Sequence, residues 1–207
     1  MPEYLWDNLV VGNTKHFKIH IPKVNKKLKE TYSDDELKKL LQKPDLKQCD
    51  FSEYKVWVFS NYLLATGNRI STALHVKIAD VDFDNALIQL NHTKNRTAQF
   101  IPLSQTLSKI LKEYLRYRKG EPKDYLFCNS YGNKPDLRTY QDMLAAYNRN
   151  RGVEKTSAHL YRHTFAKKWI LNGGDIFRLQ PKSRIIVPRN SRLHAVNHSI
   201  NAWIFVR

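Results

Sequence analysis

Cysteine is almost absent from this chain, which has two in 207 residues, Cys49 and Cys128. Their number and spacing supply neither a disulfide framework nor a set of zinc ligands, so we interpret both as buried or incidental thiols in a reducing compartment. Long apolar runs are also lacking, since no stretch approaches the ~20 residues of a transmembrane helix. Met1 does not begin a signal peptide. These absences predict a cytoplasmic protein with no membrane partner.

Acidic residues are scarce: 19 Asp and Glu stand against 35 Lys and Arg, a formal net charge of +16. Such an excess favours a polyanionic partner, and nucleic acid is the default because neutralising phosphates drives its binding. The alternative that charge leaves open is an unrelated basic protein associated with RNA or with an anionic membrane. The C-terminal part of the chain has no acidic residue after Asp175. It also has no tyrosine after Tyr161.

The chain divides into three segments by texture. Residues 1–30 combine aromatic and basic side chains and predict a lead-in, the remnant of an interdomain linker. Residues 31–180 carry regular helical and strand patterns, and an apolar fraction of 42% is enough for one domain with a real core. Residues 181–207 have five basic residues, no acidic ones and no periodicity, so they are expected to be a separate tail.

Within residues 31–180 the patterns predict a mainly helical α+β domain. Ser33 with Glu36 three residues later is a capping-box sequence that opens a first helix. Gly67 is expected to end a second helix that runs from about Tyr54 to Ala65. The other predicted elements are a short helix over 70–75, strands near 81–83, 86–90 and 99–103, and helices after Ser104, over 138–149 and after Ser157.

Tyrosines recur at helical spacing in the predicted helices. This spacing is typical of a helix face that packs into the core, and we interpret these tyrosines as core residues and not as a platform for stacking bases. They are Tyr54, Tyr62, Tyr114 and Tyr117.

A set of basic residues in a fixed order points to chemistry. Arg69 follows a Thr-Gly-Asn turn at 66–68, Lys94 lies in the polar connection before a strand, and His159 precedes Arg162 by one helical turn. Arginine grips phosphate oxygens at two points, and lysine offers a point charge and a proton. Preorganised cations stabilise the charge that develops on a phosphodiester under attack. We therefore predict phosphodiester chemistry in which Arg69 and Arg162 hold non-bridging oxygens.

The other members of the set have less defined roles. Lys94 is placed to protonate a leaving 5′ oxygen, and His159 to act as a base or as a hydrogen-bond donor to phosphate. Arg96 and Lys77 are further candidates for contact with DNA. His159 and His163 form a His-x-x-x-His pair, but the Glu of zinc peptidases is missing, so neither a metal nor another cofactor is expected.

The order of these motifs resembles the catalytic domain of the tyrosine recombinases, the phage integrase family. In that family the first arginine lies in a Thr-Gly-x-Arg turn, as Arg69 does. Its lysine lies on a hairpin eight residues before a strand proline, as Lys94 lies before Pro102. Its His-x-x-Arg continues with His-Thr-Phe-Ala, as it does here from His159. The resemblance covers roughly residues 29–180 and implies a mainly helical fold with a small antiparallel β-sheet.

The resemblance also implies a function: site-specific recombination and integration of DNA by cleavage and rejoining through a 3′-phosphotyrosyl intermediate, without metal or cofactor. The implied setting is a prokaryotic mobile genetic element such as a phage, and the implied partners are double-stranded DNA at the nucleoid and other recombinase protomers. The family continues into a Leu-Gly-His-Ser turn and a nucleophilic tyrosine, whereas this chain reads Pro181-Lys182-Ser183-Arg184 after Gln180. We find no nucleophile, because Tyr161 occupies a normally apolar position and is expected to face the core.

Two hypotheses follow for the chain. It is a recombinase catalytic domain, or it is the same fold acting as a catalytically silent DNA-binding remnant of an integrase. The sequence favours the silent remnant, since the usual position of the nucleophile is not filled. The tail at 181–207 is then interpreted as the product of a frameshift, as a mobile-element junction or as an artificially introduced end.

Overall fold

The computed structural model describes residues 30–91, 98–129 and 131–174. Nearly all of the predicted lead-in and tail lies outside these ranges, so the predicted segment boundaries stay predictions. The helices are α1 (Asp34–Leu41), α2 (Phe51–Thr66), α3 (Ile70–Ala73), α4 (Gln105–Arg118), α5 (Leu137–Asn150) and α6 (Ala158–Leu171), with a 3-10 turn η1 (Ile78–Asp80). The strands are β1 (Val81–Asp82), β2 (Leu87–Leu90) and β3 (Gln99–Pro102).

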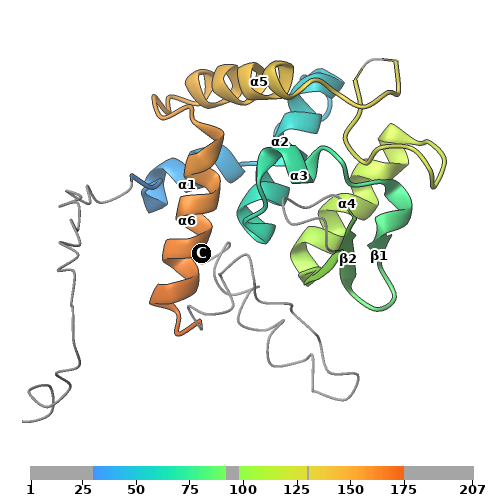
Figure 1. Cartoon of the computed structure of the whole chain (residues 1–207). Helices are drawn as coiled ribbons and strands as arrows, with labels where there is room; N and C mark the ends of the chain where they lie inside the picture. The colour runs from blue at the N-terminus through green and yellow to red at the C-terminus, as the bar shows by residue number, and fades with distance from the viewer. Residues whose placement is uncertain (1–29, 92–97, 130, 175–207) are drawn as a thin grey trace, which may run out of the picture.

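Helix α2 is the centre of the fold. Residues 54–64 are buried on every side, which is what a helix that is apolar around its whole circumference requires. Helices α1, α4, α5 and α6 all pack against it. In Figure 1, α5 lies across one end of the molecule, while α6 and the sheet lie on opposite sides of α2 and α3.

The sheet is small and antiparallel, with the order β1-β2-β3. Val81 pairs with Ile88, and Ile88 pairs with Ile101, so one face of each strand is directed to the core. This arrangement confirms the predicted α+β class, mainly helical with a small antiparallel sheet. The connection between β2 and β3, which holds Lys94 and Arg96, lies outside the described residues.

The predicted start of α1 is correct. The Ser33 hydroxyl accepts from the Glu36 amide at 3.2 Å, and the Glu36 carboxylate accepts from the Ser33 amide at 2.7 Å, which confirms the capping box. Ser104 and Ser157 cap α4 and α6 with one hydrogen bond each, which their hydroxyls accept from the Leu107 and His159 amides. Helix α2 begins three residues earlier than predicted, because Asp50 accepts from the Glu53 amide and caps it.

The prediction for the tyrosines is correct in three cases and wrong in one. Tyr54, Tyr62 and Tyr114 are buried. Tyr117, in the last turn of α4, is 55% exposed. Its ring meets the edge of Tyr54 at 5.7 Å between centroids, so it lies at the rim of the core instead of inside it.

Candidate phosphate-binding site

The turn that carries Arg69 is built by the end of α2. Gly67 has the left-handed backbone conformation, with φ of 62°, and its amide donates to the Leu63 carbonyl at 2.9 Å. This is the usual glycine C-cap. The Asn68 side chain then donates to the Tyr62 hydroxyl at 3.1 Å, which holds the turn to the buried helix. Arg69 is therefore presented, half-buried, from a rigid corner between α2 and α3.

Helix α6 locks onto the same turn from the other side. The Arg162 guanidinium donates through Nη1 to the Gly67 carbonyl. Phe165, one turn later on α6, lies directly over the glycine, and a Cβ built on Gly67 would overlap the Phe165 ring. Gly67 is thus required twice, by its positive φ and by the closeness of α6. Through this packing, residues about a hundred positions apart in the sequence form one corner.

The corner concentrates positive charge. Burial, followed by the neighbouring Arg69 charge, lowers the pKa of Arg162 below the usual arginine range. Arg162 contacts the carbonyl of Gly67, two residues before Arg69, so the two positive charges belong to the same corner. Arginine nonetheless keeps its charge at neutral pH. Within the three described ranges no carboxylate forms an ion pair with Arg69 or Arg162. An anion placed between them would relieve the repulsion.

The other predicted site residues are placed to different extents. His159 is exposed in the first turn of α6, one turn before Arg162, as the motif predicts. Lys77 is exposed at the start of η1, and no contact in the described part of the chain joins it to either arginine. Lys94 and Arg96 lie outside the described residues, so their roles stay predictions. The structure therefore brings Arg162 to the turn that carries Arg69, and His159 lies one helical turn before Arg162.

Tyr161 faces the core, as predicted from its apolar motif position. It is fully buried, and its hydroxyl donates to the Asn148 side chain at 2.7 Å. Burial raises the pKa of Tyr161 to about 12, so its hydroxyl holds its proton at neutral pH. Because Tyr161 is fully buried, its hydroxyl is not accessible to a DNA phosphate.

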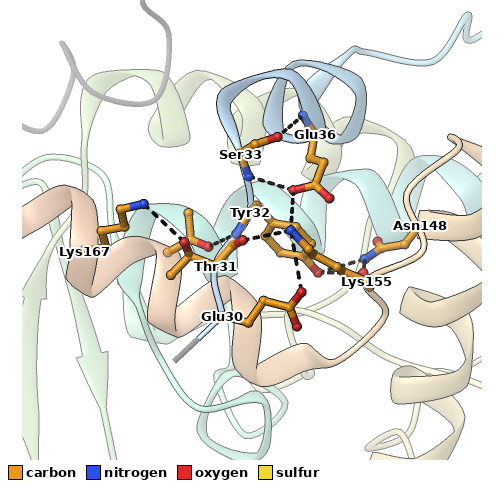
Figure 2. A network of polar contacts seen from close by, with 9 residues as sticks. Glu30, Thr31, Tyr32, Ser33, Glu36, Asn148, Lys155 and Lys167 are labelled. Carbon is orange, nitrogen blue, oxygen red and sulfur yellow. Dashed lines mark hydrogen bonds and ion pairs between the residues drawn. The ribbon is translucent and has the colours of Figure 1, made fainter. Parts of the chain in front are cut away.

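A second polar cluster fastens the N-terminal segment to α6, and sequence analysis did not identify it. The Tyr32 amide donates to the Thr164 hydroxyl at 2.9 Å, and Lys155 pairs with Glu36 at 3.1 Å and with Glu30 at 3.7 Å. Figure 2 shows Lys155 between these carboxylates, with Asn148 nearby. These contacts span more than 110 positions in the sequence, so no local pattern could have revealed them.

The described residues contain neither a cluster of metal ligands nor a helix that could cross a membrane. Among the described residues no group of three or more His, Cys, Asp or Glu side chains is placed to hold a metal ion. None of the helices in those residues has the length and apolar character needed to span a bilayer.

Comparisons with known proteins agree with the geometry. The sequence model of the Phage integrase family matches residues 30–181. A protein of Acholeplasma phage L2 named "Probable integrase/recombinase" is 32% identical over 166 residues, which are 78% of this chain and 55% of that protein. The chain thus spans about half the length of the curated relatives that it matches.

Solved structures show the same fold. The crystal structure of XerA recombinase aligns with a TM-score of 0.62 and 26% identity, over 90% of this chain and 62% of that one. The XerH site-specific recombinase in its pre-cleavage complex with the difH substrate also aligns with a TM-score of 0.62 and 26% identity, over 74% of this chain and 46% of that one. The predicted tyrosine-recombinase catalytic-domain fold is confirmed.

Proposed function

This chain belongs to the phage integrase family, and we propose that its domain binds duplex DNA by holding one backbone phosphate between Arg69 and Arg162. The observation that supports the proposal is the corner itself, where Arg162 contacts the turn that carries Arg69 and no described carboxylate pairs with either arginine. Arginines are suited to this role because each offers several N–H donors in a fixed plane. The net charge of +16 supplies the longer-range attraction to DNA.

The remaining predicted residues extend this site. His159, exposed one turn before Arg162, is proposed to donate a hydrogen bond to the same phosphate. Lys94 and Arg96, in the connection between β2 and β3, are proposed to reach the DNA backbone next to it, with Lys94 as the proton donor to a leaving 5′ oxygen. Lys77 is proposed as a peripheral contact that acts through charge alone.

The catalytic role is a separate proposal. The names of the similar proteins describe integrases and recombinases, and one is a complex with its DNA substrate. By analogy, the domain would stabilise the phosphate during strand cleavage through a phosphotyrosine in the assembly of protomers. Because no tyrosine follows Tyr161 and Tyr161 itself is buried, we propose that this chain alone binds DNA without becoming covalently attached.

Binding is tested by fluorescence anisotropy with a labelled duplex. Arg69→Ala and Arg162→Ala are each expected to weaken binding about tenfold, as loss of one charge-assisted contact does. Arg138→Ala is the matched control, since Arg138 is an exposed arginine on α5 that pairs with Asp142. An equal, small effect of all three substitutions would refute the phosphate site. Complete loss of binding in one folded variant would contradict a contact to one phosphate among several.

Covalent chemistry is tested by incubation with a nicked suicide duplex followed by a denaturing gel. No adduct, with a mobility shift in a parallel native gel, is expected for a binder without a nucleophile. A protein–DNA adduct would contradict this part of the proposal. Peptide sequencing would then identify the attached residue.

A further inference from the structure

A buried relay of hydrogen bonds passes through Tyr161, the residue directly before Arg162. Tyr161 has one hydroxyl proton, and it points to the Asn148 oxygen at 2.7 Å. Ser60, which lies 3.3 Å from the Tyr161 oxygen, is therefore the donor in their contact. Asn148 donates in turn to the Tyr32 oxygen at 2.8 Å, and Tyr32 donates to the Lys155 carbonyl at 3.2 Å.

The relay joins α6 to three other parts of the fold and to the connection that leads into it. Ser60 belongs to α2, Asn148 to α5 and Tyr32 to the segment before α1, while Lys155 lies in the connection between α5 and α6. After Ser60, each donor in the series also accepts a hydrogen bond from the preceding group, so all the hydrogen bonds run in one direction. Ser60, Asn148 and Tyr161 are each at most 2% exposed, which shields these bonds from water.

Two parallel rows of side chains fix the rotation of α6. Arg162 and Phe165 form one row, which lies on the Gly67 turn. Tyr161 and Thr164 form the next row, which the relay and the Tyr32 amide hold. Residues three apart lie above one another on a helix, and adjacent residues are about 100° apart around it. A rotation of about 10° would move a group at the helix surface, roughly 6 Å from the axis, by about 1 Å.

We propose that Tyr161 is a positioning residue for Arg162, and that its hydroxyl sets the rotation of α6 at which the Arg162 guanidinium meets the Gly67 turn and a bound phosphate. The phosphate part rests on the proposed DNA-binding function, whereas the placement of the guanidinium does not. Tyr161 touches neither DNA nor Arg69. It acts through the helix on which both it and Arg162 stand.

Tyr161→Phe tests this, because it removes the hydroxyl and keeps the ring that meets Tyr32 edge-on at 5.0 Å. Tyr140→Phe is the matched control: Tyr140 is equally buried, and its hydroxyl donates to the Cys128 carbonyl at 3.2 Å, away from α6. Ser60→Ala removes the donor to the Tyr161 hydroxyl and serves as a milder second variant.

The first measurement needs no DNA. The Arg162 Nε–H resonance in a proton–nitrogen NMR spectrum, identified by its loss in Arg162→Ala, reports the surroundings of the guanidinium. Tyr161→Phe and, less strongly, Ser60→Ala are expected to shift this resonance, whereas Tyr140→Phe leaves it in place. A shift in Tyr140→Phe as large as that in Tyr161→Phe, or no shift in either, would overturn the inference.

The second measurement is a double-mutant cycle of affinity for duplex DNA. Tyr161→Phe is expected to weaken binding about threefold in the wild-type background and to have no effect in the Arg162→Ala background, since its influence passes through that arginine. An unreduced effect in the Arg162→Ala background would overturn the inference. If Arg162→Ala itself leaves DNA affinity unchanged, the proposed function fails, while the NMR result still decides the positioning role.

Discussion

Two sets of cations on or beside α6 have opposite surroundings. Lys155 and Lys168 pair with carboxylates of the N-terminal segment, Lys155 with Glu36 at 3.1 Å and Lys168 with Asp34 at 2.6 Å. Arg162, on the same helix as Lys168, instead donates to the carbonyl of Gly67, and no described carboxylate pairs with Arg162 or Arg69. The paired lysines connect the segment around α1 to the region of α6. The charges of the two arginines are left uncompensated within the described residues.

The largest expected effect on stability comes from a substitution of Gly67, whose turn carries Arg69 and contacts Arg162. Gly67→Ala should lower the free energy of unfolding by about 3 kcal/mol, because it combines a left-handed backbone with an overlap of the Phe165 ring. Gly132 also has a positive φ, but nothing lies within 4 Å of a Cβ built there. Gly132→Ala should therefore cost only about 1 kcal/mol. Denaturant unfolding measures both, and equal losses would show that α6 does not press on the turn.

Replacing Lys155 or Arg162 by methionine compares what the two sets of cations contribute to stability and to DNA binding. Lys155→Met should lower the free energy of unfolding by about 1–2 kcal/mol, because Glu36 and the Thr31 carbonyl lose a partly buried donor. It should leave DNA affinity within about twofold. Arg162→Met also removes the donor to the Gly67 carbonyl, so it should lower the free energy of unfolding by about 1 kcal/mol, but it alone should weaken DNA affinity, roughly tenfold. If Lys155→Met weakens DNA affinity as much as Arg162→Met does, the contrast between the two sets of cations is wrong.

The paired lysines and the two arginines should also differ, by a smaller effect, in how they influence stability at acid pH. The hydrogen bond and charge of Lys168 lower the pKa of Asp34 in the folded protein. A carboxyl with a depressed folded pKa contributes stability above its unfolded pKa of about 3.9 and loses that contribution as the pH falls below it. Asp34→Asn should therefore flatten the acid limb of the unfolding midpoint slightly, whereas Arg162→Met should leave it unchanged because arginine does not titrate there. A flattened acid limb in Arg162→Met instead would contradict the assignment of charges.

Local signals explain what the sequence predicts well. Ser33, Ser104 and Ser157 were recognised as helix caps because a cap depends only on the next three residues. Gly67 was recognised as a helix end for the same reason. Asp50 carries the same signal. The apolar pattern, however, indicates a helix only from Tyr54 onward, so the predicted start of α2 is three residues too late.

Distant contacts explain what the sequence does not predict. The motif order predicts that Arg69 and Arg162 share a site, yet the bond from Arg162 to Gly67 joins positions 95 apart. The contacts of Asn148 with Tyr32, 116 positions away, leave no periodic trace. Tyr117 has the spacing of a core residue, but its exposure is decided by where neighbouring helices end. Lys94 and Arg96 remain predictions from their motif positions alone.

The most direct test of the account is the salt dependence of DNA affinity. The logarithm of the dissociation constant would be measured against the logarithm of the potassium chloride concentration for the wild type, Arg69→Ala, Arg162→Ala and Arg138→Ala. Each phosphate contact adds about one to this slope, because it releases a condensed counterion. Arg69→Ala and Arg162→Ala are each expected to lower this slope by about one, whereas Arg138→Ala is expected to leave it unchanged. Wild-type slopes in the Arg69 and Arg162 variants would contradict a phosphate held between these two arginines.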